Sequence, residues 1–275
     1  MAGLLKLSGP VGLTGPAGGA QSSALQSAAL EAMIAGGARG LIYPTSGAAD
    51  RYYQKSAYDA FIQDALFPDV EYQFPLAAGA PAGAASATNP ALDFTVPASP
   101  NGARSTIAEQ VDGYDGANNP DLWMVLCVTP GDQDSPTVMM SVLASSGFGT
   151  AIYRPNALDK IIFAVDSTHT LDIVNEEASP ELPHVYSVRY EVTTGYARTY
   201  RDGVQTNNWN LTSMHPTAQM VTGPIGIGAV GAIGTAAVFT NDNGLFHLGC
   251  VGNGILTNAQ HTAIIDWIKD LYGIA

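Results

Sequence analysis

The run of seven apolar residues from Leu122 to Val128 constrains the fold more than any other stretch of the chain. In a β-strand, successive side chains point to opposite faces, so an uninterrupted apolar run must be buried on both sides. We therefore expect residues 122–128 to form a central strand with protein packed against both of its faces.

A second strand signal lies at residues 184–193, where apolar and polar side chains alternate. This alternation predicts a strand with one packed face and one face in water. A turn at 194–195 leads into a partner strand, Tyr196–Arg201, and Asp202-Gly203 is a dipeptide typical of type I′ hairpins. Because short β-rich runs separated by turn residues continue from about residue 90, the sequence predicts a mainly β, antiparallel sandwich.

The C-terminal residues predict one closing helix, Asn258–Tyr272. Thr257 and Gln260 have capping-box spacing, and Gly273 stands where a helix-ending glycine is expected. The helix carries an apolar stripe at Ile264, Ile265, Ile268 and Leu271. We expect this stripe to pack across an edge or end of the sandwich.

The N-terminal part of the chain has a different texture. Ser22–Ala35 and Arg51–Phe67 space apolar residues as helices do, and the stretch between residues 76 and 90 is rich in Ala, Gly and Pro. We therefore predict three parts, which are a small helical N-terminal attachment region (1–75), a linker (76–90) and the sandwich (91–275). Glycine at every third position between residues 9 and 18 resembles collagen spelling, but three triplets are too few for a triple helix, and an extended Gly/Pro arm is the simpler interpretation. We expect this arm and the Ala/Leu-rich helices after it to form a homo-oligomeric attachment region, with a trimer favoured.

Charge and hydropathy exclude several classes of function. The 11 Lys and Arg residues against 24 Asp and Glu residues give a net charge of −13, which disfavours nucleic acid and anionic membrane surfaces as partners. No apolar run reaches the roughly 18–20 residues of a membrane span, so membrane insertion is not expected. Residues 1–7 lack the apolar core of a secretory signal, which indicates synthesis and assembly in a cytoplasm. Cys127 and Cys250 lie in apolar stretches and are expected to be small buried residues, with their pairing left open.

Two segments of the chain resemble a known family. The hairpin of residues 186–204 resembles an element of concanavalin A-like and laminin G-like jelly-roll domains. Residues 245–251, followed by 256–260 and a helix ending in 271–274, resemble the last strand and closing helix of such domains in bacteriophage virion proteins. The resemblance covers residues 90–275 and implies a jelly-roll sandwich.

The resemblance also implies an adhesive function. In that family the domain recognises a glycan or another protein and is displayed on fibres, spikes or capsid surfaces. It implies a virion structural protein, assembled in the bacterial cytoplasm and located on the virion surface. Its partners would be other virion proteins, through residues 1–75, and a host-surface glycan or protein.

The candidate ligand-binding residues lie just after the Asp202-Gly203 hairpin. An indole surrounded by amides suits stacking on a sugar ring together with hydrogen bonding to its hydroxyl groups. A tryptophan folded under its own loop is the competing interpretation. The predicted site comprises Asn207, Asn208, Trp209 and Asn210.

Two alternative functions remain open at this stage, a polysaccharide-degrading enzyme on the same fold and a capsid-stabilising decoration protein without a ligand. A glucanase-type strand would need Glu-x-Asp-x-x-Glu, whereas around Asp172 the acids are misplaced and Glu176-Glu177 are adjacent. We therefore assign no catalytic residues. The Asp- and Asn-rich loop 112–121 has oxygen ligands that suit calcium, but it lacks the regular spacing of a calcium loop and solvated turn residues explain it more simply, so no cofactor or metal ligand is assigned.

Overall fold

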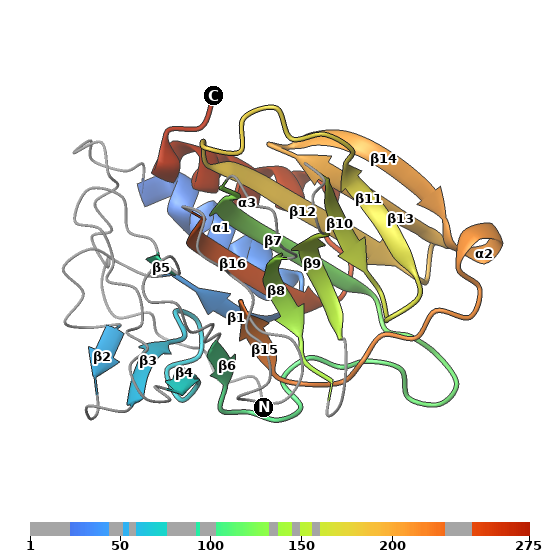
Figure 1. Ribbon diagram of the computed structural model, residues 1–275, viewed down its shortest axis with the longest axis horizontal. Helices are drawn as coiled ribbons and strands as arrows, with labels where there is room; N and C mark the ends of the chain where they lie inside the picture. Colours follow the sequence, from blue (N-terminus) through green and yellow to red (C-terminus); the bar gives the residue numbers. More distant parts are fainter. Residues whose placement is uncertain are drawn as a thin grey trace.

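The chain folds into two stacked antiparallel β-sheets with a helical layer on the outside of one of them (Figure 1). This computed structural model describes residues 23–43, 52–54, 59–75, 92–93, 103–131, 137–144, 149–155, 160–228 and 244–275. The predicted mainly β sandwich with a C-terminal helix is confirmed. The Gly/Pro arm at 9–18 and the linker at 76–90 lie outside the described residues.

The first sheet, sheet A, has the strand order β1-β16-β7-β12-β13-β14, and the short β5 also pairs with β16. Its strands are β1 (Ala38–Ile42), β5 (Leu92–Asp93), β7 (Leu122–Thr129), β12 (His184–Glu191), β13 (Tyr196–Arg201), β14 (Val204–Asn210) and β16 (Leu245–Asn253). β7 lies between β16 and β12 and all its residues are buried, which confirms the central strand predicted from the apolar run.

The second sheet, sheet B, has the strand order β11-β10-β9-β8-β15-β6-β4-β3-β2. Its strands are β2 (Tyr52–Gln54), β3 (Asp59–Gln63), β4 (Glu71–Pro75), β6 (Ala103–Ser105), β8 (Thr137–Val142), β9 (Thr150–Arg154), β10 (Ile161–Ala164), β11 (Thr170–Val174) and β15 (Ile225–Ile227). β11, at one edge of sheet B, lies beside β13 and β14 of sheet A, so the two sheets approach each other on that side.

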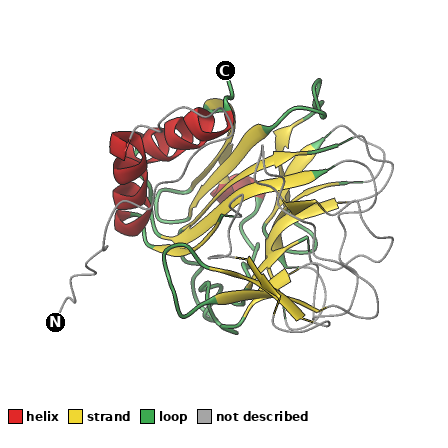
Figure 2. Cartoon of the chain, turned by 90° about the vertical axis from the view of Figure 1, so that its left-hand side faces the viewer, coloured by secondary structure: helices red, strands yellow, loops and turns green. Residues whose placement is uncertain are grey.

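Two apolar cores hold these layers together. The larger core fills the space between the sheets with side chains such as Met124, Phe163 and Tyr190. The second core lies on the other face of sheet A, where Trp123 and Val125 of β7 meet the helical layer. Figure 2 shows the two long helices on one side of the strands, which gives three layers in all.

The C-terminal helix α3 (Asn258–Tyr272) has the boundaries and caps that the sequence predicts. Thr257 and Gln260 form the capping box, and Gly273 ends the helix at φ 66°. The expected apolar stripe is buried, since Ile264, Ile265, Ile268 and Leu271 are all within 2 % exposure. The helix packs on the outer face of sheet A rather than on an edge or end, because the apolar residues of β7 and β16 on that face need a cover.

The N-terminal helix α1 (Ser23–Ala35) is also confirmed, but the structure corrects its setting. α1 packs beside α3, with Ala29 and Met33 in the second core, and β1 pairs with β16. The described part of residues 1–75 is therefore built into the sandwich rather than into a separate helical region. The attachment role predicted for residues 1–75 stays a prediction.

The predicted second helix, Arg51–Phe67, is wrong. The segment contains β2 and β3, an antiparallel pair, and β3 pairs in turn with β4. Its aromatic residues favour strands as well as a helix face, and the pairing with β4 decides between them. No helix among the described residues is long and apolar enough to span a membrane, and Cys127 and Cys250 are both buried and unpaired.

Candidate functional site

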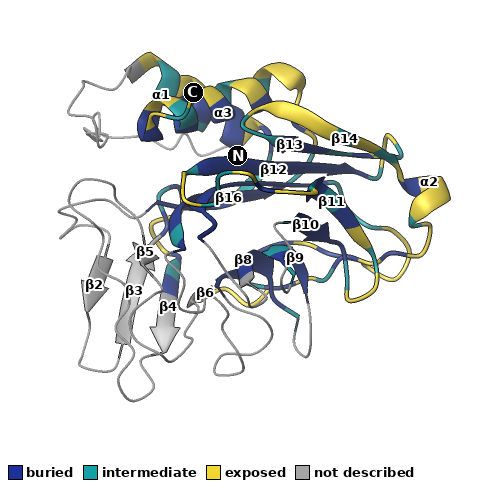
Figure 3. Ribbon diagram, turned by 45° about the horizontal axis from the view of Figure 1, so that its top comes forward, coloured by how far each residue is buried: buried dark blue, intermediate teal, exposed yellow. Residues whose placement is uncertain are grey.

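The four predicted ligand-binding residues lie on β14, the edge strand of sheet A, and not in a loop. Strand geometry divides them, because neighbouring side chains point to opposite faces. Asn207 and Trp209 face sheet B, while Asn208 and Asn210 are exposed on the outer face. Figure 3 shows that β14 is largely exposed. The structure therefore does not bring the four side chains together at one surface.

The two inward residues have structural contacts. Trp209 is half-buried and packs against the core between the sheets. The Asn207 side chain donates to the Asp172 backbone carbonyl at 3.0 Å, and Thr199 donates to the same carbonyl at 3.0 Å. These hydrogen bonds join the edges of the two sheets, so Asn207 and Trp209 close the sandwich on this side.

The two outward residues differ in how much of their chemistry is available. The Asn210 side chain caps the short helix α2 (Leu211–Met214) and accepts from the backbone N–H groups of Thr212 and Ser213. Asn208 is exposed, and its side-chain amide has no hydrogen-bond partner among the residues that the structure describes. Asn208 is therefore the member of the predicted set best placed to meet a ligand.

Two residues of β13 complete this outer face. In the strand register Tyr196 lies opposite Asn210 and Arg198 lies opposite Asn208. Tyr196 is 38 % exposed, and the Arg198 guanidinium carbon lies 5.8 Å from the centre of its ring. We call Tyr196, Arg198, Asn208 and Asn210 the outer face. It presents an aromatic ring, a cation and amides side by side.

Beside this surface, on the same face of sheet A, lies a buried polar cluster on β12, where Arg189 is paired with Arg198 and Glu191 with Tyr196. Glu191 contacts Arg198 at 2.6 Å and Arg189 at 2.5 Å, and Arg189 donates to Asn258 at the start of α3 at 2.6 Å. Although burial opposes ionisation, hydrogen bonding to Arg198 and the charge of Arg189 keep the pKa of Glu191 below its ordinary value. The predicted wet face of β12 is thus wrong, because α3 covers it.

His261 of α3 belongs to the same cluster. Its Nε2 lies 2.9 Å from the Ser187 hydroxyl, and its ring lies against Tyr200 with the ring centres 4.3 Å apart. Burial, together with the charge of Arg189, lowers the pKa of His261 to about 4. The imidazole is therefore neutral at physiological pH and adds no charge to the cluster beside the outer face.

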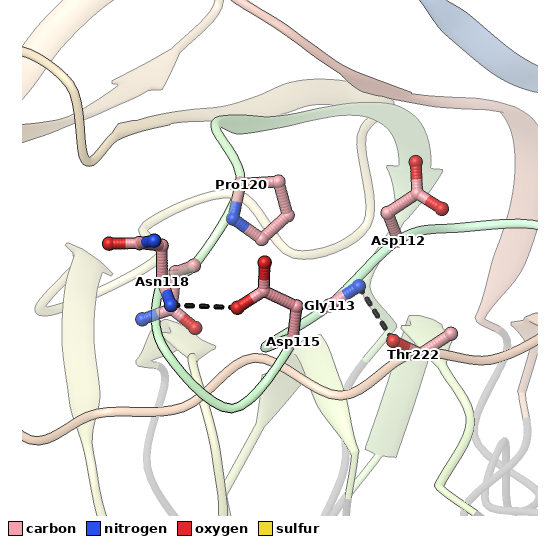
Figure 4. A pocket seen from close by; sticks show the side chains of 7 residues that line it. Asp112, Gly113, Asp115, Asn118, Pro120 and Thr222 are labelled. Atoms are coloured by element: carbon pink, nitrogen blue, oxygen red, sulfur yellow. Dashed lines mark hydrogen bonds between the residues drawn. The ribbon is translucent and has the colours of Figure 1, made fainter.

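A separate polar hollow lies between loop 112–120 and Thr222, which is in the segment that leads into β15 (Figure 4). It measures about 460 Å³ and is lined by Asp112, Gly113, Asp115, Asn118, Asn119, Pro120 and Thr222. The Gly113 N–H donates to the Thr222 hydroxyl at 2.8 Å, and Asn119 is held by the backbone of Ala218 and Met220. These contacts fix the walls of the hollow.

The same loop is where the sequence has oxygen ligands suited to calcium. One Asp115 oxygen accepts from the backbone N–H groups of Ala117 and Asn118, an arrangement typical of a polar turn. Asp112 forms an ion pair with Arg39. Among the residues that the structure describes, no three His, Cys, Asp or Glu side chains are grouped as metal ligands.

Two of the three carboxylates considered for polysaccharide hydrolysis, Glu177 and Asp172, are engaged in other contacts, and the third, Glu176, is exposed. Glu177 is 2 % exposed and accepts from Tyr186 at 2.6 Å and from Arg201 at 2.8 and 2.5 Å. Asp172 forms an ion pair with Lys160 at 2.6 Å. Neither is a free carboxylate facing a substrate cleft, as an acid/base pair would need to be.

Glu177 is part of a network that includes a histidine between two carboxylates. His184 lies 2.9 Å from Asp202 and 3.4 Å from Glu177. Burial works against its charge, but the two carboxylates outweigh it and raise the pKa of His184. Burial likewise opposes ionisation of Glu177 and Asp202, but hydrogen bonds from Arg201 and His184, respectively, lead the effects that lower their pKa values.

This network predicts how stability depends on pH. Because the pKa of His184 is raised, its contribution is complete below its ordinary value of 6.5 and is lost as pH rises through the raised pKa. The contributions of Glu177 and Asp202 are complete above their ordinary values of 4.5 and 3.8 and are lost at more acidic pH. We expect the stability difference between the parent and His184→Gln, from urea unfolding, to shrink above about pH 6.5. A constant difference up to pH 9 would contradict this assignment.

Sequence reasoning missed Tyr196 and Arg198 as surface residues of interest. Both lie in the predicted partner strand Tyr196–Arg201, and their alternation with Ala197 places them on one face. That alternation was the available signal. Which face stays uncovered depends on the position of α3, and the strand pattern alone does not give it.

The comparisons with known proteins concern the fold. No family model and no curated protein matches the chain. Among solved structures, the chain is similar to the binding domain of botulinum neurotoxin serotype D, with a TM-score of 0.54 and 10 % identity over 84 % of this chain and 51 % of that chain. It is also similar to the serotype D ligand-binding domain in complex with N-acetylneuraminic acid, with a TM-score of 0.53 and 9 % identity over 86 % and 52 %.

This chain therefore spans about half the length of the structures that it matches. At such low identity the likeness establishes a shared sandwich fold. The chain is thus a β-sandwich of the architecture found in toxin receptor-binding domains.

Proposed function

We propose that this protein is a non-catalytic binding domain that recognises a glycan or protein on a host surface through its outer face. The observation that carries the proposal is the exposed Tyr196 ring beside Arg198 and Asn208 on an uncovered edge of sheet A. The fold likeness to receptor-binding domains, one of them in complex with a sugar, supports the same function.

The outer face has the chemistry that such recognition needs. An exposed aromatic ring stacks on the apolar face of a sugar, and an amide both donates to and accepts from hydroxyl groups. One small face of this kind binds weakly, on the order of millimolar. Display in several copies raises the effective affinity by about 10²–10⁴.

We further propose that the domain acts as a virion structural protein, displayed in several copies through residues 1–75, with a trimer favoured. The resemblance of the last strand and closing helix to those of jelly-roll domains in bacteriophage virion proteins supports this role. A weak single site also needs display in several copies to bind a surface firmly, and this need supports the same role. The hydrolytic alternative is less well supported, because Glu177 and Asp172 are engaged with Tyr186, Arg201 and Lys160.

The test is binding of the labelled full chain to a panel of bacterial strains and to an immobilised glycan array. Tyr196→Ala is expected to reduce monovalent affinity about fivefold or more, because it removes the stacking surface at the centre of the outer face. Ile107→Ala is the matched control, since Ile107 is also a large exposed apolar residue, at 43 % exposure.

Equal binding by Tyr196→Ala and the parent, with unchanged melting temperatures, would contradict the proposal that the outer face is the binding surface. Release of reducing sugars from the array polysaccharides would instead favour the enzymatic alternative. Trp209→Ala is unsuitable for this test, because the indole packs against the core and its loss would change stability.

A further inference from the structure

We propose that the outer face recognises the carboxylate group of an acidic saccharide, with Arg198 contacting the carboxylate and Tyr196 stacking on the sugar ring. This inference rests on the proposed function and names the class of ligand for the same site. It runs against the net charge of the whole chain, which disfavours anionic partners such as nucleic acid and anionic membrane surfaces.

The number of cations and anions among the charged side chains of β12 and β13 carries the inference. Arg189 and Arg198 both contact a single carboxylate, that of Glu191. The other described ion pairs of Lys and Arg hold at least as many carboxylates as cations, as in Lys160 with Asp172, or Arg201 with Glu177 and Asp202. The β12–β13 cluster therefore holds one more cation than anions, in a chain whose net charge is −13.

The groups in direct contact with the two arginines do not cancel this excess. His261 is neutral at physiological pH, and Asn258 and Tyr200 are uncharged contacts of Arg189. The adjacent turn brings in one acid, Asp121, whose two oxygens accept from the backbone N–H of Thr193 at 2.9 Å and its hydroxyl at 2.7 Å. Asp121 keeps its negative charge, but no described ion pair joins it to either arginine.

The geometry of Arg198 suits a carboxylate. Its Nη1 is held by Glu191 at 2.6 Å and its guanidinium lies over the Tyr196 ring, so the side chain is fixed before a ligand arrives. The side chain is 26 % exposed, whereas Glu191 is 3 % exposed, so the cation rather than the acid meets solvent. A planar guanidinium can donate two parallel hydrogen bonds to a carboxylate.

The acidic net charge is compatible with an anionic ligand at this place. At physiological salt the Debye length is about 8 Å, so charges elsewhere on the surface are screened from the outer face. A contact at hydrogen-bond distance is screened much less. The Arg198 guanidinium, at contact distance, then favours a carboxylate on the ligand over a neutral group.

The experiment is an NMR titration of the full chain at 150 mM NaCl with four sugars. These are N-acetylneuraminic acid, its methyl ester, glucuronic acid and glucose. We expect at least one free acid to bind at millimolar concentration and its neutral counterpart to bind at least fivefold more weakly. The two acids distinguish a sialic from a uronic acid source.

Arg198→Gln is expected to weaken binding of the acid at least fivefold. Lys160→Gln is the matched control, because it removes the same charge from a cation that is paired with Asp172 of β11 and lies outside the outer face. Arg198→Lys keeps the charge but lacks the planar pair of donors, and we expect intermediate binding.

Each other result decides between the inference and the proposed function. If neutral and acidic sugars bind equally, or if Arg198→Gln binds like the parent, the inference is wrong and the proposed function stands. If the chain binds bacterial cells but none of the four sugars, the inference is wrong and a protein receptor is favoured. If it binds neither cells nor any glycan of the array, the proposed function itself fails.

Discussion

Replacing Ile268 by aspartate is expected to lower the free energy of unfolding by more than about 4 kcal/mol, or to prevent folding. Ile268 is fully buried in the second core, between α3 and sheet A, among Trp123, Trp267 and Leu248. An aspartate there would be a buried charge with apolar neighbours. Urea unfolding followed by circular dichroism measures the change.

The matched control is Thr262→Asp, which places the same side chain on the exposed face of α3, near its N-terminus. The helix dipole favours a negative charge at that end, so we expect little change in stability. Equal stability of Ile268→Asp and the parent would mean that α3 is not packed on sheet A as described.

Removing the carboxylate of Glu177 is expected to cost about 3–5 kcal/mol, because it leaves buried partners without their counter-charge. Glu177 accepts from Tyr186 and from two nitrogens of Arg201, and it lies 3.4 Å from His184. The Glu177→Ala variant therefore disconnects the loop after β11 from the β12–β13 hairpin. Urea unfolding at pH 6 is the measurement.

Glu176→Ala is the control for this variant, since the neighbouring glutamate is exposed and loses the same number of atoms. We expect a change within about 0.5 kcal/mol there. Similar effects for the two glutamates would show that the network contributes nothing specific.

Local signals explain which elements the sequence predicts correctly. β7 follows from seven consecutive apolar residues, and α3 from an apolar stripe with caps at both ends. The β13–β14 turn follows from Asp202-Gly203, where both residues have positive φ, at 53° and 84°. Each of these signals lies within a few residues of the structure it determines.

The errors arise where distant segments decide the outcome. The polar residues Ser187, Arg189 and Glu191 read as a solvent face, but α3, some seventy residues later, covers them and they pair with one another and with its first turn. In the same way, residues 59–63 form a strand because they pair with β4, although their apolar pattern also fits a helix. Short apolar patterns are ambiguous between helix and strand until their partners are known.

The candidate site is predicted in part for the same reason. The sequence places an amide-rich segment after the hairpin, and the structure leaves Asn208 exposed on it. The inward direction of Trp209 follows from strand register, and the charge excess at Arg198 follows from the shared contact with Glu191. Neither is visible in composition, where net charge points to the opposite class of ligand.

The most direct test of the central claim is to map the binding surface by amide chemical-shift changes in the full chain. The probes are oligosaccharides released from bacterial surface polysaccharides. The account predicts the largest shifts at Tyr196, Arg198 and Asn208. Shifts concentrated instead at Asp115 and Asn118 would place the ligand in the polar hollow and contradict the claim that the outer face is the binding surface.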